Sequence, residues 1–87
     1  MEQGAFSLTP PVDRDAVDDA IAALELRLCA VLPDGAGLQI VAVSPDRRTK
    51  ATFVSSTLPL FDRVLLEGAR AVELASRLET IVSGGPS

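Results

Sequence analysis

The stretch DRDAVDDAIAALELRLCAVL, residues 13–32, decides how this chain is expected to fold. Asp13 can accept a hydrogen bond from the free amides of a first helical turn, and the aspartates after it place negative charge where the helix dipole favours it. Pro33 ends the pattern, because its ring clashes with a preceding helical turn. The stretch therefore predicts one long helix over residues 13–32.

Apolar residues recur along this predicted helix at helical spacing and leave it almost no polar face. Between residues 20 and 32 only Glu25 and Arg27 are charged. One apolar stripe follows steps of three and four residues and consists of Val17, Ile21, Leu24, Leu28 and Val31. A surface helix normally keeps one face in water. We therefore expect a second protein chain to cover part of this helix.

Two runs rich in β-branched residues, 38–43 and 51–54, follow the predicted helix. Residues 44–50 between them include Pro45 and Asp46 and predict a hairpin loop. Both faces of the first strand are apolar, which is typical of a strand covered on both sides. Because an isolated two-stranded hairpin is marginal in water, we expect pairing with another chain's hairpin.

A second helix is predicted from Ser56 and Thr57 to about Val82, with glycine and proline after it. Its apolar face again steps by three and four residues. That face consists of Phe61, Val64, Gly68, Ala71, Ala75, Leu78 and Val82.

These elements predict an α+β fold with the order helix, antiparallel β-hairpin, helix (αββα), completed by dimerisation. Residues 13–83 form the single predicted domain, between an N-terminal tail of residues 1–12 and a C-terminal tail of residues 84–87. The predicted interface consists of Val17, Ile21, Leu24, Leu28, Val31, Phe61, Val64, Gly68, Ala71, Ala75 and Leu78.

Residues 32–41, a charged turn and residues 51–56 before a helix resemble the opening segment of bacterial GAF-type sensory domains. In that segment a helix leads through a short loop into two antiparallel strands and another helix. The resemblance covers about residues 17–70. A GAF domain continues with strands that complete a sheet and a ligand pocket. The resemblance therefore implies that the dimerising helices are kept without the pocket, and no binding residue is carried over.

The residue types present exclude several classes of chemistry. The chain has no histidine and one cysteine, Cys29, so it forms no internal disulfide, no histidine-based zinc site and no catalytic triad with histidine. Cys29 is expected to be a small apolar residue of the core or of an interface. Asp15, Asp18 and Asp19 could hold a cation, but an acidic cluster that complements the helix dipole is favoured. We predict no enzyme and no catalytic, cofactor-binding or metal-binding residue.

Charge and aromatic content bear on the partners. The net charge is −4, and Tyr and Trp are absent, so nucleic acid is disfavoured. Arg47, Arg48 and Lys50 lie at the predicted hairpin tip and are a candidate anion site, with a solvated loop favoured over it. Charged residues interrupt every apolar run before it reaches membrane-spanning length, and the first residues lack the basic and apolar regions of a signal peptide, so secretion is not expected. We expect a cytoplasmic protein.

The leading functional hypothesis is a non-enzymatic protein–protein interaction or regulatory module, either a homodimer or bound to a partner protein. One alternative is a small-molecule sensor or carrier with an apolar pocket, whose polar candidates are Gln39, Thr52, Ser55 and Ser56. A further alternative is an anion or nucleic-acid binder that uses the basic hairpin tip.

Overall fold

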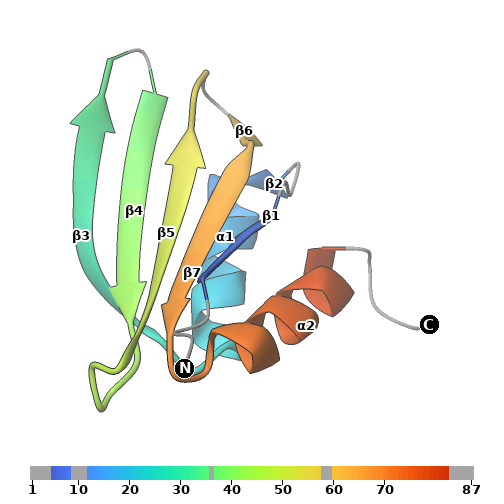
Figure 1. Cartoon of the computed structure of the whole chain (residues 1–87). Helices are drawn as coiled ribbons and strands as arrows, with labels where there is room; N and C mark the ends of the chain where they lie inside the picture. The colour runs from blue at the N-terminus through green and yellow to red at the C-terminus, as the bar shows by residue number, and fades with distance from the viewer. Residues whose placement is uncertain (1–4, 9–11, 36, 58–59, 83–87) are drawn as a thin grey trace.

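The computed structural model describes residues 5–8, 12–35, 37–57 and 60–82. It shows a small α+β fold in which one five-stranded antiparallel sheet carries both helices on the same face (Figure 1). The strand order is β1-β7-β5-β4-β3, and the strands are β1 (Ala5–Leu8), β3 (Arg27–Asp34), β4 (Gly37–Val43), β5 (Thr49–Ser55) and β7 (Arg63–Gly68). The helices are α1 (Arg14–Ala23) and α2 (Ala71–Val82). A two-stranded sheet pairs β2 (Val12–Asp13) with β6 (Leu60–Phe61).

Helix α1 begins at the predicted residue but is much shorter than predicted. The carboxylate of Asp13 accepts a hydrogen bond of 2.9 Å from the amide of Ala16, which caps the first turn. The helix ends at Ala23, and Glu25 then adopts a left-handed backbone with φ of 61°. Only short polar residues and glycine adopt this conformation at low cost, so local preference gives no warning of the turn. The predicted helix is therefore wrong beyond Ala23.

Residues 27–34 form the edge strand β3 in place of the second half of that helix. Gly35, with φ of 63°, turns the chain directly back, so that Val31 pairs with Ile40 and Leu32 with Gln39 in β4. Pairing with β4 gives hydrogen-bond partners to the backbone on one side of the strand, apart from the irregularity between Leu28 and Ala30. The sheet context thus overrides a helical propensity that is only a weak preference per residue.

The predicted hairpin is confirmed as β4 and β5, and both strands are longer than the predicted runs. Its turn is held by Ser44 and Asp46. The Ser44 amide donates to the carbonyl of Thr49 at 2.9 Å, and the Asp46 carboxylate accepts hydrogen bonds from the Ser44 hydroxyl and the Arg48 amide. The Ser44 hydroxyl is the main cause that lowers the pKa of Asp46. The turn is an ordered structure, not a loose loop.

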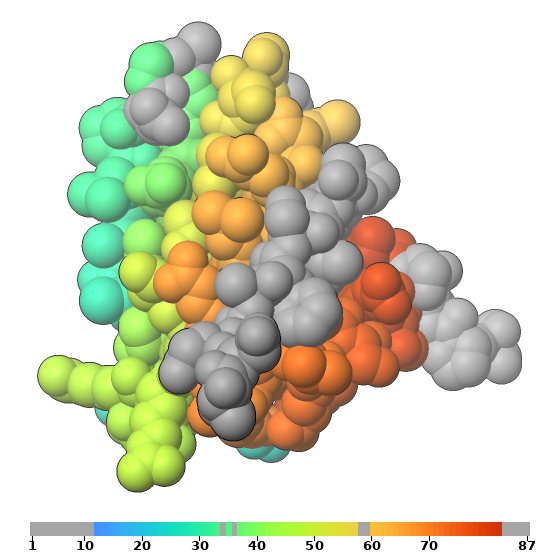
Figure 2. All heavy atoms as spheres, in the orientation of Figure 1, coloured from blue at the N-terminus to red at the C-terminus, as the bar shows by residue number. Residues whose placement is uncertain are grey.

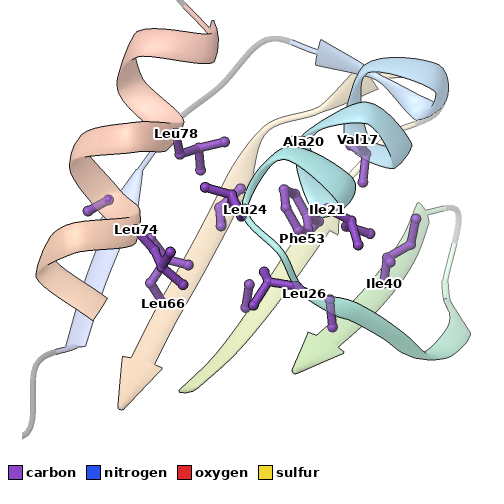
Figure 3. Close-up of a cluster of buried hydrophobic side chains, with 14 of the residues drawn as sticks. Val17, Ala20, Ile21, Leu24, Leu26, Ile40, Phe53, Leu66, Leu74 and Leu78 are labelled. Atoms are coloured by element: carbon purple, nitrogen blue, oxygen red, sulfur yellow. The ribbon is translucent and has the colours of Figure 1, made fainter. Parts of the chain in front are cut away.

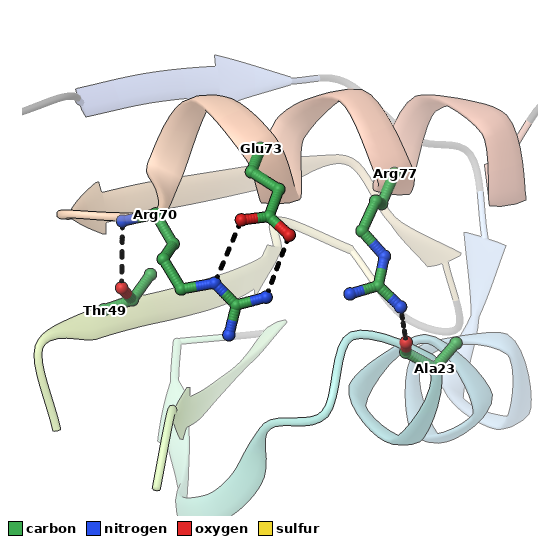
Figure 4. A network of polar contacts seen from close by, with 5 residues as sticks. All are labelled: Ala23, Thr49, Arg70, Glu73 and Arg77. Atoms are coloured by element: carbon green, nitrogen blue, oxygen red, sulfur yellow. Dashed lines mark hydrogen bonds and ion pairs between the residues drawn. The ribbon is translucent and has the colours of Figure 1, made fainter. Parts of the chain in front are cut away.

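The predicted second helix is correct only for α2, because residues 63–68 form strand β7 between β5 and β1. Gly68, with φ of 119°, ends the strand, and the Arg70 amide donates to the Thr49 hydroxyl at 3.1 Å (Figure 4). Arg70 also pairs with Glu73 at 3.0 Å, and its hydrogen bonds lower the pKa of Glu73. Arg77 donates to the Ala23 carbonyl and so joins α2 to the end of α1.

The N-terminal segment contributes strands where a tail was predicted. Residues 5–8 pair antiparallel with β7 as strand β1, and Val12 pairs with Phe61. The predicted C-terminal tail, residues 84–87, lies outside the described residues. No helix in the described ranges is long and apolar enough to cross a membrane.

The hydrophobic core lies between the sheet and the two helices (Figure 3). Helix α1 contributes side chains that point toward Phe53 and Ile40 of the sheet, and α2 contributes Leu74 and Leu78. The two helices and the C-cap residue of α1, Leu24, contribute Val17, Ala20, Ile21, Leu24, Ala71, Leu74, Ala75 and Leu78 to this core. The chain therefore covers the apolar stripe of α1 by itself.

Candidate interaction surface

Most of the predicted interface residues are buried inside the chain's own core. The buried ones are Val17, Ile21, Leu24, Phe61, Val64, Ala71, Ala75 and Leu78. Their assignment to an interface is wrong, because β5, β7 and α2 already cover the faces that a partner chain was expected to cover. The expectation failed because residues 57–68 do not extend a helix away from α1 but return as sheet.

The three other predicted interface residues lie elsewhere. Leu28 and Val31 are on the edge strand β3, where 52% and 38% of their surfaces are exposed. Gly68 is half-buried at the end of β7. Cys29 is exposed on the same edge strand, so it is not part of the core, and its place in an interface stays a prediction.

The second face of the sheet carries no helix, and it is turned toward the viewer in Figures 1 and 2. Strand alternation places every second residue on this face. Its middle row runs across four strands by direct pairing, from Ala30 through Val41 and Thr52 to Leu65. Three of these four side chains are apolar and the fourth is threonine. We call this surface the open sheet face.

Two further rows complete the open sheet face. One consists of Leu32, Gln39, Val54 and Arg63, and the other of Arg27, Val43, Lys50 and Glu67. Thr52 and Val54 are only 9% and 8% exposed although they lie outside the helix-side core, because their neighbours on adjacent strands shield them. The face is thus a closely packed apolar surface with charged residues toward its ends.

Sequence reasoning missed the open sheet face because it missed three of the five strands of the sheet, β1, β3 and β7. The signal was present in RVLLEG, residues 63–68, where Val64 and Leu66 alternate with Leu65. An apolar run of this length fits a strand covered on both faces as well as part of a helix. The helical interpretation prevailed because the same residues also fit steps of three and four.

The free edge of the sheet at β3 is poorly shaped for pairing with another strand. Its register shifts between Leu28 and Ala30, which is a β-bulge, and Pro33 has no amide to donate. Bulges and prolines of this kind are common devices that prevent edge-to-edge association. The open sheet face is therefore a better candidate surface than the β3 edge.

A pocket of about 460 Å³ lies where β3 meets the β4–β5 turn. Its walls include Arg27, Leu28 and Cys29 on one side and residues 43–45 with Arg47 on the other. Among the described residues, neither Arg27 nor Arg47 forms an ion pair. Arg47 has a left-handed backbone with φ of 62°, held by the hydrogen bonds of the turn.

The candidate anion site at the hairpin tip is only partly assembled. Arg47 lines the pocket, whereas Arg48 is exposed elsewhere in the turn and Lys50 lies in β5 on the open sheet face. The pocket adds Arg27, which sequence reasoning placed on a helix. Anion binding stays a prediction, with Arg27 and Arg47 as its best-placed pair.

The polar candidates for a small-molecule pocket do not converge. Gln39 and Thr52 belong to the open sheet face, and Ser56 is exposed. Ser55 lies on the helix side, and its hydroxyl is buried with no hydrogen-bond partner within the described part of the chain. The described residues also include no group of three or more histidine, cysteine or carboxylate side chains that could hold a metal ion.

Comparison of the chain with protein-family models, with curated proteins and with solved structures gave no match. The resemblance to GAF-type domains therefore stays a prediction.

Proposed function

We propose that this chain is a non-enzymatic protein-interaction module that assembles as a homodimer through its open sheet face. The observation that supports this proposal is the apolar middle row, Ala30, Val41, Thr52 and Leu65, on the face that carries no helix. An antiparallel sheet with one solvated face normally alternates apolar and polar residues, so that the wet face is polar. Here both faces are apolar at their centre, and the second one needs a cover.

The open sheet face is large enough for a small interface. Four strands about 4.8 Å apart, each with three residues spaced about 6.8 Å apart, cover a flat area of about 400 Å². Six of these twelve residues are apolar. A second copy would remove about this area from each partner, which is about half of the roughly 800 Å² per partner of a standard interface, so we propose a weak dimer.

We also propose a cytoplasmic location. The thiol of Cys29 is exposed, and it has no second cysteine in the chain with which to pair. A reducing compartment keeps such a thiol free.

The substitution Leu65→Asp tests the dimer. A carboxylate in the middle row would be desolvated by the second copy without a partner, so we expect the dissociation constant of the dimer to rise by about 100-fold or more. The fold should persist, because Leu65 lies outside the helix-side core. Sedimentation velocity measures the mass, and circular dichroism measures the fold.

A matched control is Val72→Asp, which makes the same kind of change on the exposed side of α2, where 63% of the valine is exposed. This variant should dimerise like the wild type. A monomeric wild type, or a Leu65→Asp protein that dimerises as tightly as the wild type, would contradict the proposed function.

A second candidate function, small-anion binding, is favoured by one observation. Arg27 and Arg47 line the pocket beside β3, whose wall is partly apolar. Neither arginine forms an ion pair within the described ranges. Guanidinium groups bind phosphate and carboxylate through parallel hydrogen bonds. We propose a small phosphate or carboxylate compound as the ligand class.

Inorganic phosphate is the probe for this second function. We expect phosphate to shift the amide resonances of residues 27–29 and 43–47. Binding should weaken between 50 and 200 mM salt, because the Debye length falls by about half over this range. Arg47→Ala should abolish the shifts. Arg48→Ala, in the same turn but outside the pocket walls, should leave them unchanged, and equal losses in both variants would contradict the pocket assignment.

A further inference from the structure

Strand β7 carries opposite charges at the two ends of the open sheet face. Arg63, Leu65 and Glu67 alternate on this face, so Leu65 lies midway between a cation and an anion. Arg63 and Glu67 are exposed, and within the described ranges neither forms an ion pair. The strand thus shows a pattern, positive, apolar, negative, that is complementary to its own reverse.

A twofold axis that relates two copies of the chain can bring these opposite charges together in one orientation. If the axis lies in the interface plane and runs along the middle row, each strand stacks on its own copy in the opposite direction. The middle row then faces itself, so that Leu65 meets Leu65 of the second copy and Thr52 meets Thr52. The row that ends in Arg63 faces the row that ends in Glu67, so Arg63 and Glu67 find a partner in the second copy. In the same two rows Lys50 faces Val54 and Arg27 faces Leu32.

The other aligned orientation, with the axis parallel to the strands, pairs at most one of the two charges. With the axis between β5 and β7, Glu67 faces Lys50 of the second copy, but Arg63 faces Val54 and stays unpaired. With the axis over β5, strand β7 of one copy lies over β4 of the other in the same direction. Arg63 then faces Gln39, and Glu67 faces Val43. A stack of this kind leaves both charges against uncharged side chains, which costs desolvation without a compensating contact.

We infer that two copies stack their open sheet faces with strands antiparallel, and that Arg63 of each copy pairs with Glu67 of the other to set this register. The inference rests on the proposed function, since it specifies the geometry of that dimer. Sheets that pack face to face keep their strand directions within about 30°, which matches the arrangement. The apolar rows supply the affinity, and the two symmetric ion pairs at the rim supply specificity.

Charge reversal tests the register. Arg63→Glu gives each copy two negative positions, and Glu67→Arg gives each copy two positive positions, so each homodimer contains two like-charge contacts. We expect the dissociation constant of each variant to rise by about tenfold or more. An equimolar mixture of the two variants should form a heterodimer close to wild-type affinity, because every contact in it pairs opposite charges.

Two further proteins complete the experiment. The double variant Arg63→Glu, Glu67→Arg reverses the pattern but keeps it self-complementary, so it should dimerise like the wild type. Glu79→Arg, an exposed reversal on α2, should also dimerise like the wild type. Because Glu67→Arg places an arginine beside Lys50, thermal unfolding of each variant is followed alongside sedimentation velocity.

The outcomes separate this inference from the proposed function. If both single variants dimerise like the wild type, or if the mixture does not restore assembly, the antiparallel register is wrong. If Leu65→Asp is nevertheless monomeric, the open sheet face remains the dimer surface with another register. If Leu65→Asp also dimerises like the wild type, the proposed function fails together with the inference.

Discussion

Leu66→Asp is expected to prevent folding at neutral pH. Leu66 has none of its surface exposed and lies in the helix-side core with Ala51 of β5 and Leu74 of α2. An unpaired carboxylate at such a site costs several kcal/mol after relaxation. A small domain has about 5–15 kcal/mol of total stability, and one of this size lies toward the lower end. Far-ultraviolet circular dichroism should show loss of helix and sheet.

Its matched control is the neighbouring residue. Leu65→Asp makes the same chemical change one position earlier on β7, where the side chain points to the open sheet face. That protein should keep its fold and lose only assembly. Two folded variants, or two unfolded ones, would contradict the assignment of opposite faces to these residues.

Gly68→Ala is expected to destabilise the fold by about 3 kcal/mol or more, the upper range for single substitutions. A methyl group at Gly68 would lie 2.0 Å from the backbone carbonyl oxygen of Arg48, and φ of 119° is a conformation that side chains disfavour. Because the clash is with backbone, the β4–β5 turn or the start of α2 must shift. The midpoint of urea unfolding measures the loss.

Gly35→Ala is the control for backbone conformation alone. Gly35 has φ of 63° in the β3–β4 turn, and a methyl group there would meet nothing within 4 Å. We expect a loss of about 1 kcal/mol from the left-handed conformation. Equal losses for Gly35→Ala and Gly68→Ala would show that the close approach of Arg48 to Gly68 does not exist.

The hairpin, the start of α1 and the end of α2 were predictable because their signals are local. Asp13 caps α1, and the β-branched runs at 38–43 and 51–54 have turn residues between them. The pattern over residues 24–34 was ambiguous, because leucines and valines at steps of three and four can also pair in a strand. What decides the segment is the left-handed turn at Glu25 and the pairing with β4, and both depend on the rest of the fold.

The same ambiguity explains why the predicted interface was placed on the wrong surface. The sequence analysis assigned an apolar excess to a long first helix, but the chain covers the face of that helix through Phe53, Leu66 and Leu74. The excess reappears on the opposite side of the sheet. Sequence periodicity counts apolar positions, but it does not show which of the two faces of a strand a helix will cover. The proposed partner class therefore persists, while the surface changes.

The central proposal is that two copies associate through the open sheet face. Contacts observed between the two chains test it most directly. A mixture of isotope-labelled and unlabelled protein, studied by isotope-filtered nuclear Overhauser spectroscopy, detects only protons that approach across the interface. We predict contacts from the Leu65 methyl groups of one copy to Leu65 and to the Thr52 methyl group of the other. Contacts between chains that involve only helix residues such as Ala22 and Val72, or none at concentrations where the protein is a dimer, would contradict the account.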